Sequence, residues 1–234
     1  MLVRPTSILR GLVFPGAVLA LLSLSCAKKP PSGGPGTYRG VLVNSTSTGS
    51  LDVTVGEASR GPLPASGTLV LGGTTASLSG TLDRSNATLS LSSTDGYQLT
   101  GDSRPAYAFG SFTSSEDRGS FALFQENANS PVRLLCGTFF WIAPANSSPS
   151  PFAVAATPSG AAMCVAPSFV WFGDLDGNDA LACEGSVTSV VFGNVDVDAG
   201  NHWGTGEDYG SWTVSPCGGD ASNGPDGGSG SAVD

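Results

Sequence analysis

The chain has a single histidine and no lysine after Lys29, and these gaps exclude several classes of enzyme. With His202 alone, an H-E-x-x-H metal site is impossible, and any Ser-His-Asp triad would have to use this residue. The missing lysines exclude a Walker A phosphate loop and a Schiff-base enzyme in the body. There is no G-x-S-x-G nucleophile elbow, and Gly204-x-Gly206 lacks the third glycine of a dinucleotide-binding loop. A carboxylate pair would suffice for glycoside hydrolysis, but nothing singles one out. We therefore predict a protein that is not an enzyme.

Basic residues are missing from the second half of the chain. Residues 134–234 hold 11 acidic side chains and no lysine or arginine, whereas residues 26–133 hold eight of each sign. A protein that binds nucleic acid needs clustered Lys or Arg to release the counterions of the phosphates. The composition therefore excludes nucleic acid as a partner. The acidity is typical of a solvated surface, with cation binding as the alternative.

The apolar run near the N-terminus is too short for a comfortable membrane span. Residues 11–25 make 15 residues interrupted by Pro15 and Gly16, whereas a spanning helix needs about 20. Arg4 and Arg10 precede the run, and small residues end it. This is the pattern of an export signal, so we predict a signal peptide over residues 1–25.

The end of this signal resembles the lipobox at which bacterial lipoproteins are cleaved. The residues are Leu-Leu-Ser-Leu-Ser-Cys, ending at Cys26, with Ser23 in the place that leucine usually takes. The resemblance implies cleavage before Cys26 and lipid on that cysteine, and two or three acyl chains make a stable membrane anchor. The residue after the cysteine is Ala27 and not an aspartate, and in this the chain resembles lipoproteins that are sent to the outer membrane. Proline and glycine then predict a flexible tether, so that residues 26–36 are the lipidated cysteine and its tether.

The remaining four cysteines form an even set, as expected in an oxidising compartment. Three pairings are possible, and we favour Cys136 with Cys217 and Cys164 with Cys183, a nested arrangement that closes the second half of the chain end to end. Zinc is the alternative, but the spacing contains no C-x-x-C pair.

The sequence after the predicted tether indicates β-strands throughout, because apolar and small polar residues alternate with a period of two. Turn-forming residues interrupt the pattern every 8 to 12 residues, including Ser93-Thr94-Asp95-Gly96 and Asp176-Gly177. Glycine in these turns accepts the positive φ that tight hairpins require. Such short connections favour an antiparallel up-and-down meander. The apolar residues expected on one buried face are Leu51, Val53, Val55, Leu69, Leu71, Leu78, Leu82, Leu89, Leu91, Tyr97, Leu99, Tyr107, Phe109, Phe121 and Leu123.

A faint internal repeat divides the body into two units. The octet beginning at Glu116 matches the one beginning at Glu207, at a spacing of 91 residues. We predict two related small β-barrel-like units in tandem, residues 37–130 and 131–217, with one larger barrel or a sandwich as the alternative. Residues 218–234 lack large apolar side chains except Val233, which predicts a disordered tail.

The repeated Ser-Gly-Thr strands of residues 68–101 resemble a loose group of Gly/Ser/Thr-rich bacterial envelope proteins. The later Gly-Ser-Phe and Gly-Ser-Trp tripeptides extend the resemblance over most of residues 38–217. It implies a small β-barrel and implies neither an activity nor catalytic residues.

The segment Asp174-Leu175-Asp176-Gly177-Asn178-Asp179 begins like a calcium loop, with oxygen ligands at alternate positions. An EF-hand needs glycine at the sixth position and glutamate at the twelfth, where this chain has Asp179 and Gly185. A hairpin turn explains the segment more simply. If calcium is a cofactor, the candidate ligands are Asp174, Asp176, Asn178 and Asp179.

The four tryptophans all fall in the second half of the chain: Trp141, Trp171, Trp203 and Trp212. Core filling is their ordinary role on the strands of a small barrel. The alternative is a ligand pocket lined by aromatic rings at a barrel mouth. From the sequence we expect a non-enzymatic, lipid-anchored envelope protein of the outer membrane with a structural or interaction role, and a small-molecule-binding lipoprotein is the alternative.

Overall fold

The computed structural model describes residues 31–115, 117–127, 131–141, 148–184, 190–194, 200–205 and 208–217. Sixteen β-strands account for the regular structure of these segments. None of the segments forms a helix long and apolar enough to cross a membrane. The predicted signal peptide, the lipidation site Cys26 and the predicted tail 218–234 lie outside the described residues.

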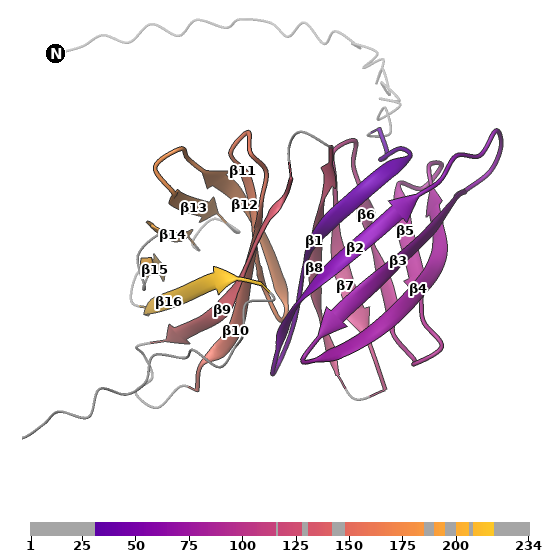
Figure 1. Cartoon of the computed structure of the whole chain (residues 1–234). Coiled ribbons are helices and arrows are strands. Elements are labelled where there is room, and N and C mark those ends of the chain that lie inside the picture. The colour runs from indigo at the N-terminus through magenta and orange to yellow at the C-terminus, as the bar shows by residue number, and fades with distance from the viewer. Residues whose placement is uncertain are drawn as a thin grey trace, which may run out of the picture.

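The first eight strands form a closed antiparallel barrel in which each strand pairs with the next and β8 pairs with β1 (Figure 1). The strands are β1 Gly36–Asn44, β2 Thr48–Val55, β3 Leu63–Leu71, β4 Thr74–Asp83, β5 Thr88–Ser92, β6 Gln98–Ser103, β7 Tyr107–Thr113 and β8 Arg118–Glu126. The predicted all-β meander is confirmed.

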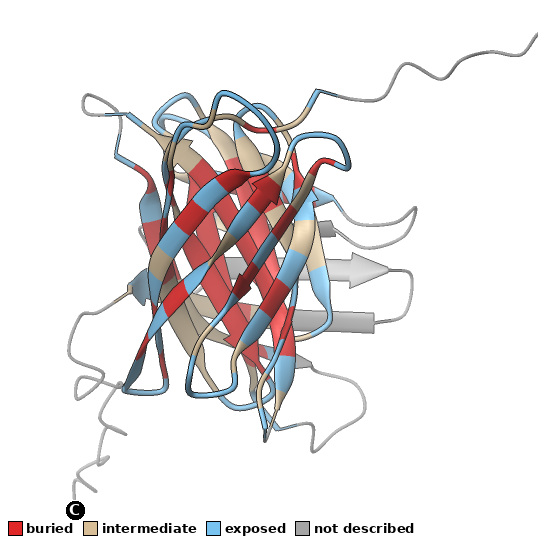
Figure 2. Ribbon diagram, turned by 90° about the vertical axis from the view of Figure 1, so that its right-hand side faces the viewer, coloured by how far each residue is buried: buried red, intermediate tan, exposed pale blue. Residues whose placement is uncertain are grey.

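The interior of the first barrel is filled by the residues that the period-two pattern places on one face. In β3, for example, buried and exposed side chains alternate along the strand. In Figure 2 the strands nearest the viewer show the same alternation. The interior cluster consists of Tyr38, Leu42, Leu51, Val53, Val55, Leu63, Ala65, Leu69, Leu71, Ala76, Leu78, Leu82, Leu89, Leu91, Leu99, Ala108, Phe112, Phe121 and Leu123, with Tyr97 partly buried against it.

The remaining eight strands pair in a second antiparallel ring, in which β16 closes on β9 through seven residue pairs. The strands are β9 Arg133–Trp141, β10 Ser150–Ala156, β11 Ala161–Ala166, β12 Phe169–Leu175, β13 Ala180–Glu184, β14 Val190–Asn194, β15 Gly200–Thr205 and β16 Asp208–Pro216. The pairing of β14 with β15 covers only two residue pairs. Two barrel-like units in tandem, and not one larger barrel, are therefore observed.

A third apolar cluster joins the outer faces of the two barrels. Val41 and Val43 of β1 pack with Ala153 and Ala155 of β10, and all four side chains are fully buried. These strands are buried on both faces, which explains the uninterrupted apolar runs in their sequences. The cluster consists of Val41, Val43, Ala122, Phe124, Val132, Leu134, Ala153, Ala155, Met163 and Val165.

The prediction that Tyr107 and Phe109 lie on the buried interior face was wrong. Both side chains lie on the outside of β7 and pack against the cluster between the barrels, while Ala108 and Phe112 take the interior positions of that strand. Phe172 of β12 meets both rings, with centroid distances of 5.6 Å to Tyr107 and 5.0 Å to Phe109. The alternation of β7 was read correctly, but the face that carries Ala108 and Phe112, and not the face that carries Tyr107 and Phe109, fills the barrel.

Candidate functional site

The chain enters the first barrel through a short docked segment, residues 31–35. The Gly33 amide donates to the Ser103 hydroxyl at 3.2 Å, and Ser103 is fully buried. A Cβ on Gly33 would lie 2.5 Å from the Ser103 hydroxyl oxygen and 2.9 Å from the Arg104 carbonyl oxygen. Only glycine permits this close approach of the segment to the end of β6.

Tyr38 holds the same segment from inside the barrel. Its hydroxyl accepts from the Gly34 amide at 3.1 Å and donates to the Gly34 carbonyl at 2.9 Å. Burial raises the pKa of the Tyr38 phenol, and the backbone bond to Gly34 opposes that rise. The hydroxyl therefore keeps its proton over the ordinary pH range and remains a donor. The tether predicted over residues 26–36 is shorter than expected, since residues 33–36 are hydrogen-bonded or part of β1.

Three loops surround the docked segment: residues 56–62, 84–87 and 104–106. We call this end of the first barrel the tether end. Each loop carries one arginine, namely Arg60, Arg84 and Arg104, and the three together hold a single acidic residue, Glu57. Arg104 pairs with Asp102 at 3.4 Å. A hollow of about 400 Å³ opens beside the docked segment and is lined by Pro35, Glu57, Ala58, Ser59, Leu63 and Arg84.

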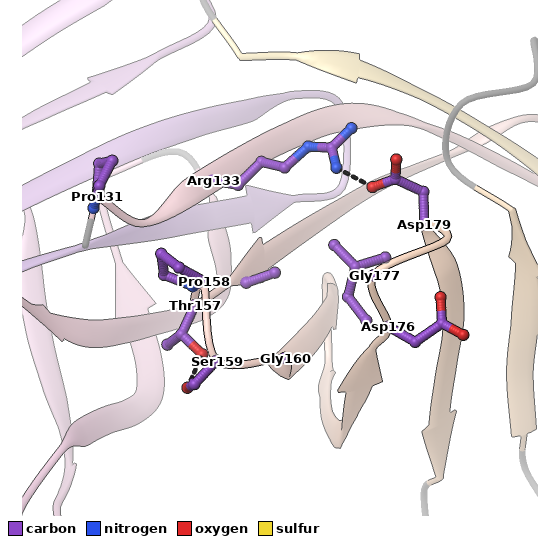
Figure 3. Close-up of a pocket in the computed structure, with 11 residues that line it drawn as sticks. Pro131, Arg133, Thr157, Pro158, Ser159, Gly160, Asp176, Gly177 and Asp179 are labelled. Atoms are coloured by element: carbon purple, nitrogen blue, oxygen red, sulfur yellow. Dashed lines mark hydrogen bonds and ion pairs between the residues drawn. The ribbon is translucent and has the colours of Figure 1, made fainter. Parts of the chain in front are cut away.

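A pocket of about 350 Å³ lies at the mouth of the second barrel. Its floor includes Ala156 and Leu175, two buried members of the interior core. Arg133 reaches across it from the start of β9 to form an ion pair with Asp179, and the hydroxyls of Thr157 and Ser159 lie 2.9 Å apart at its edge (Figure 3). Arg133 is the last lysine or arginine of the chain. The guanidinium that the second unit carries therefore lies at the mouth of the second barrel.

The calcium-like segment forms the β12–β13 hairpin turn. One carboxylate oxygen of Asp176 accepts from the Asn178 amide at 2.8 Å and from the Ala180 amide at 2.9 Å. Asp179 is engaged by Arg133, and Asp174 ends up exposed on β12. In the described part of the chain, no three His, Cys, Asp or Glu side chains are grouped to hold a metal ion. The positive φ of this turn falls on Asp179 at 61°, not on Gly177 as we expected.

The other predicted turn has the expected glycine. Gly96 has a φ of 90°, its amide donates to Ser93, and the Ser93 amide donates to the Tyr97 carbonyl at 2.9 Å.

The tryptophans do not gather into one described pocket. Trp212 is fully buried in the interior of the second barrel, with its ring centroid 5.9 Å from that of Phe152. Trp171 is half-buried, packs against the interior cluster that contains Trp212, and stacks on Phe169 at 5.8 Å with an interplanar angle of 9°. Trp141, Trp203 and His202 lie on described strands, but their side chains lie outside the described residues. Trp212 therefore fills the core, Trp171 packs at its edge, and the exposed Phe169 begins β12.

Both predicted disulfides are present, between Cys136 and Cys217 and between Cys164 and Cys183. In the first bond, Cys217 comes directly after the last residue of β16, and its partner Cys136 lies on β9. The bond therefore lies where the second barrel closes. The second lies fully buried in the interior core of that barrel.

Sequence reasoning did not find the roles of Gly33, Ser103 and Arg133. The glycines of the predicted tether indicated a flexible segment by composition. The structural role of Gly33, however, depends on its hydrogen bond to Ser103, which lies 70 residues away in the sequence. Arg133 did carry a signal, because it is the last basic residue before a stretch of 11 acidic ones. A lone cation at the start of a strand in an acidic unit was a reason to look for a partner such as Asp179.

Comparison with known proteins finds no match to this chain among family models, curated proteins or solved structures. The barrel body that the resemblance to envelope proteins implies is observed. Membership of that group and the lipobox stay predictions.

Proposed function

We propose that this chain is a lipid-anchored cell-envelope protein, attached to the outer membrane, with a non-enzymatic structural or interaction role. The observation that carries the proposal is the filled interior of the first barrel. An eight-stranded barrel is just wide enough to be filled by side chains or to hold one small ligand. Here 19 buried apolar residues occupy that space, so the barrel offers partners its outer surface.

Two further observations support the proposal. Disulfide bonds such as the pair in the second barrel persist in compartments outside the cytoplasm. The fully buried contact packs the two barrels against each other, which suits a structural or docking role. The predicted lipid on Cys26 would attach this body to the membrane.

Replacing Cys26 with alanine tests the anchor. We expect the wild-type chain, expressed in a two-membrane bacterium, to partition into the detergent phase and to carry acyl chains on its N-terminal peptide by mass spectrometry. The C26A variant is expected to lose the lipid mass and to leave the detergent phase, because one or more acyl chains supply the membrane affinity. The matched control is Ser23→Leu, which restores the usual lipobox leucine and should be lipidated at least as fully. A wild-type chain without lipid on Cys26 would contradict the proposal.

We infer small-molecule binding as a second candidate function, favoured by the pocket at the mouth of the second barrel. The pocket combines an apolar floor with a few polar groups, which is the usual composition of a ligand site. The Arg133 guanidinium would orient an anionic or strongly polar group.

Native mass spectrometry of the mature chain purified from the envelope tests this second candidate. We expect an extra mass that is lost on denaturation and is absent from Arg133→Gln, because that variant removes the cation of the pocket. Arg118→Gln, on the first barrel, is the matched control and should keep the mass. Bare protein in all three samples would reject ligand binding, and a mass of one calcium ion would point to the β12–β13 turn instead.

A further inference from the structure

We propose that an aromatic patch between the two barrels docks a partner protein through a lysine or arginine side chain that is flanked by apolar residues. We call this surface the inter-barrel patch. It consists of Tyr107 and Phe109 of β7, Phe172 of β12, and the carboxylates Asp174 and Glu184 beside them. The inference deepens the interaction role proposed above and rests on it, but it does not require lipid on Cys26.

The rings of the patch come from both barrels. The Phe172 ring meets Phe109 edge to face, at an interplanar angle of 86°, and is inclined by 59° to Tyr107. Inclined rings cover each other only in part, and Phe172 remains 40% exposed. Aromatic surface of this kind, next to a buried apolar contact, is typical of a site that binds a partner.

Two carboxylates lie beside the exposed ring. Glu184 is directly opposite Phe172 in the pairing of β12 with β13, and such cross-strand neighbours have Cβ atoms about 5 Å apart. Asp174 follows Phe172 by two residues and therefore points to the same face of β12. Both acidic residues are exposed. A cation over the Phe172 ring would have a carboxylate on two sides.

The charges around the patch are predominantly negative. The β6–β7 hairpin, residues 98–113, and the β12–β13 hairpin, residues 169–184, together carry one basic residue, Arg104. Strand β8 carries one charge of each sign, and β11 carries none. The acidic residues of the two hairpins are Asp102, Asp174, Asp176, Asp179 and Glu184.

The arginines near these hairpins are engaged by other acids. Arg104 pairs with Asp102, and Arg133 pairs with Asp179. Among the residues that the structure describes, neither Asp174 nor Glu184 forms an ion pair. No lysine or arginine follows Arg133 in the sequence. A cation from a second protein would therefore meet two carboxylates that the second unit itself does not neutralise.

This combination selects the chemistry of the partner. The face of an aromatic ring attracts an ammonium or guanidinium group, and the carboxylates add ion pairs to it. The methylene stem of lysine or arginine and its apolar neighbours can cover the rest of the exposed ring. An anionic partner would be repelled. A purely apolar partner would desolvate two carboxylates without pairing them.

A single methionine provides a reporter beside the patch. After removal of residues 1–25, Met163 is the only methionine of the chain. It is fully buried and lies directly opposite Phe172 in the pairing of β11 with β12. Labelling with ¹³C-methyl methionine therefore gives one NMR signal, which is sensitive to the ring next to it. The mature chain is purified from the envelope in a non-ionic detergent for this measurement.

The probe is the peptide Gly-Leu-Lys-Leu-Gly with both ends blocked. The comparison peptide carries an acetylated lysine, which loses the charge but keeps the stem. We expect the lysine peptide to move the Met163 signal in a saturable manner, and the acetylated peptide to bind about fivefold more weakly or less.

Three variants locate the binding to the patch. Asp174→Asn with Glu184→Gln should weaken binding of the lysine peptide about fivefold, because two ion pairs are lost. Phe172→Leu, which keeps an apolar side chain but removes the ring, should weaken it about threefold. The matched control, Glu57→Gln with Asp95→Asn, removes two exposed carboxylates from the ends of the first barrel and should leave the affinity unchanged.

Several results would overturn the inference. They are a Met163 signal that does not move, equal binding of the two peptides, and an affinity that survives D174N/E184Q. A signal that shifts on dilution without peptide would assign the patch to a second copy of this chain instead. The mass of the N-terminal peptide from the same sample reports the lipid on Cys26, so that failure of the anchor is recognised separately.

Discussion

Replacing Ala155 with aspartate is expected to lower the free energy of unfolding by about 3–5 kcal/mol, because it leaves an uncompensated charge between the barrels. Ala155 is fully buried on the outer face of β10, between Leu134 of β9 and Met163 of β11. All three side chains belong to the cluster that packs against the first barrel. Urea unfolding with the disulfides intact measures the loss.

The matched control places the same carboxylate on a strand without burying it. Ser66 is exposed on β3 and has the uncharged Thr54 and Ser79 on either side. Ser66→Asp should change the free energy of unfolding by no more than about 0.5 kcal/mol. If A155D and S66D cost the same, the two barrels are not held together by this apolar contact.

Much of the interior of the first barrel could be predicted from the sequence because a sheet with one buried face leaves a period-two pattern. Leu69 and Leu71 or Leu89 and Leu91 alternate with small polar residues and are buried as expected. The contact between the barrels leaves no such period. In Val41-Leu42-Val43 and in Phe152–Ala156 every side chain is buried, and a continuous apolar run does not reveal which residues face the interior and which face a second barrel.

The candidate site was only partly predictable for a related reason. Counting predicted two disulfides, because the removal of Cys26 leaves four cysteines in an exported chain, and the nested pairing was the favoured one of three. The ion pair of Arg133 with Asp179 joins residues 46 positions apart, and only the closure of the ring brings the start of β9 to the β12–β13 turn. The oxygen-rich sequence of that turn indicated calcium, but its Asp176 carboxylate is used by the backbone of the same hairpin.

The docked tether links the fold to the proposed function. With the proposed lipid on Cys26, a flexible linker would let the barrels rotate freely above a membrane, whereas a chain fixed at Gly33 would restrict how the first barrel can turn. The cluster between the barrels then orients the second barrel as well.

Removing the Cys136–Cys217 bond is expected to lower the free energy of unfolding by about 2–5 kcal/mol, and the chain-entropy estimate for this loop is about 4.5 kcal/mol. The bond spans 81 residues and joins the first and last strands of the second barrel. The corresponding entropy estimate for the Cys164–Cys183 loop of 19 residues is only about 3 kcal/mol. The seam between β16 and β9 is where the ring closes, so this bond restrains the largest part of the unfolded unit.

A double-mutant cycle provides the control for the bond. Cys136→Ala, Cys217→Ala and the double variant are compared with the wild type by urea unfolding. Because either single change already breaks the bond, each single variant should lose as much stability as the double variant. Losses that add up in the double variant would mean that the packing of the two side chains, and not the covalent closure of the barrel, stabilises the second unit.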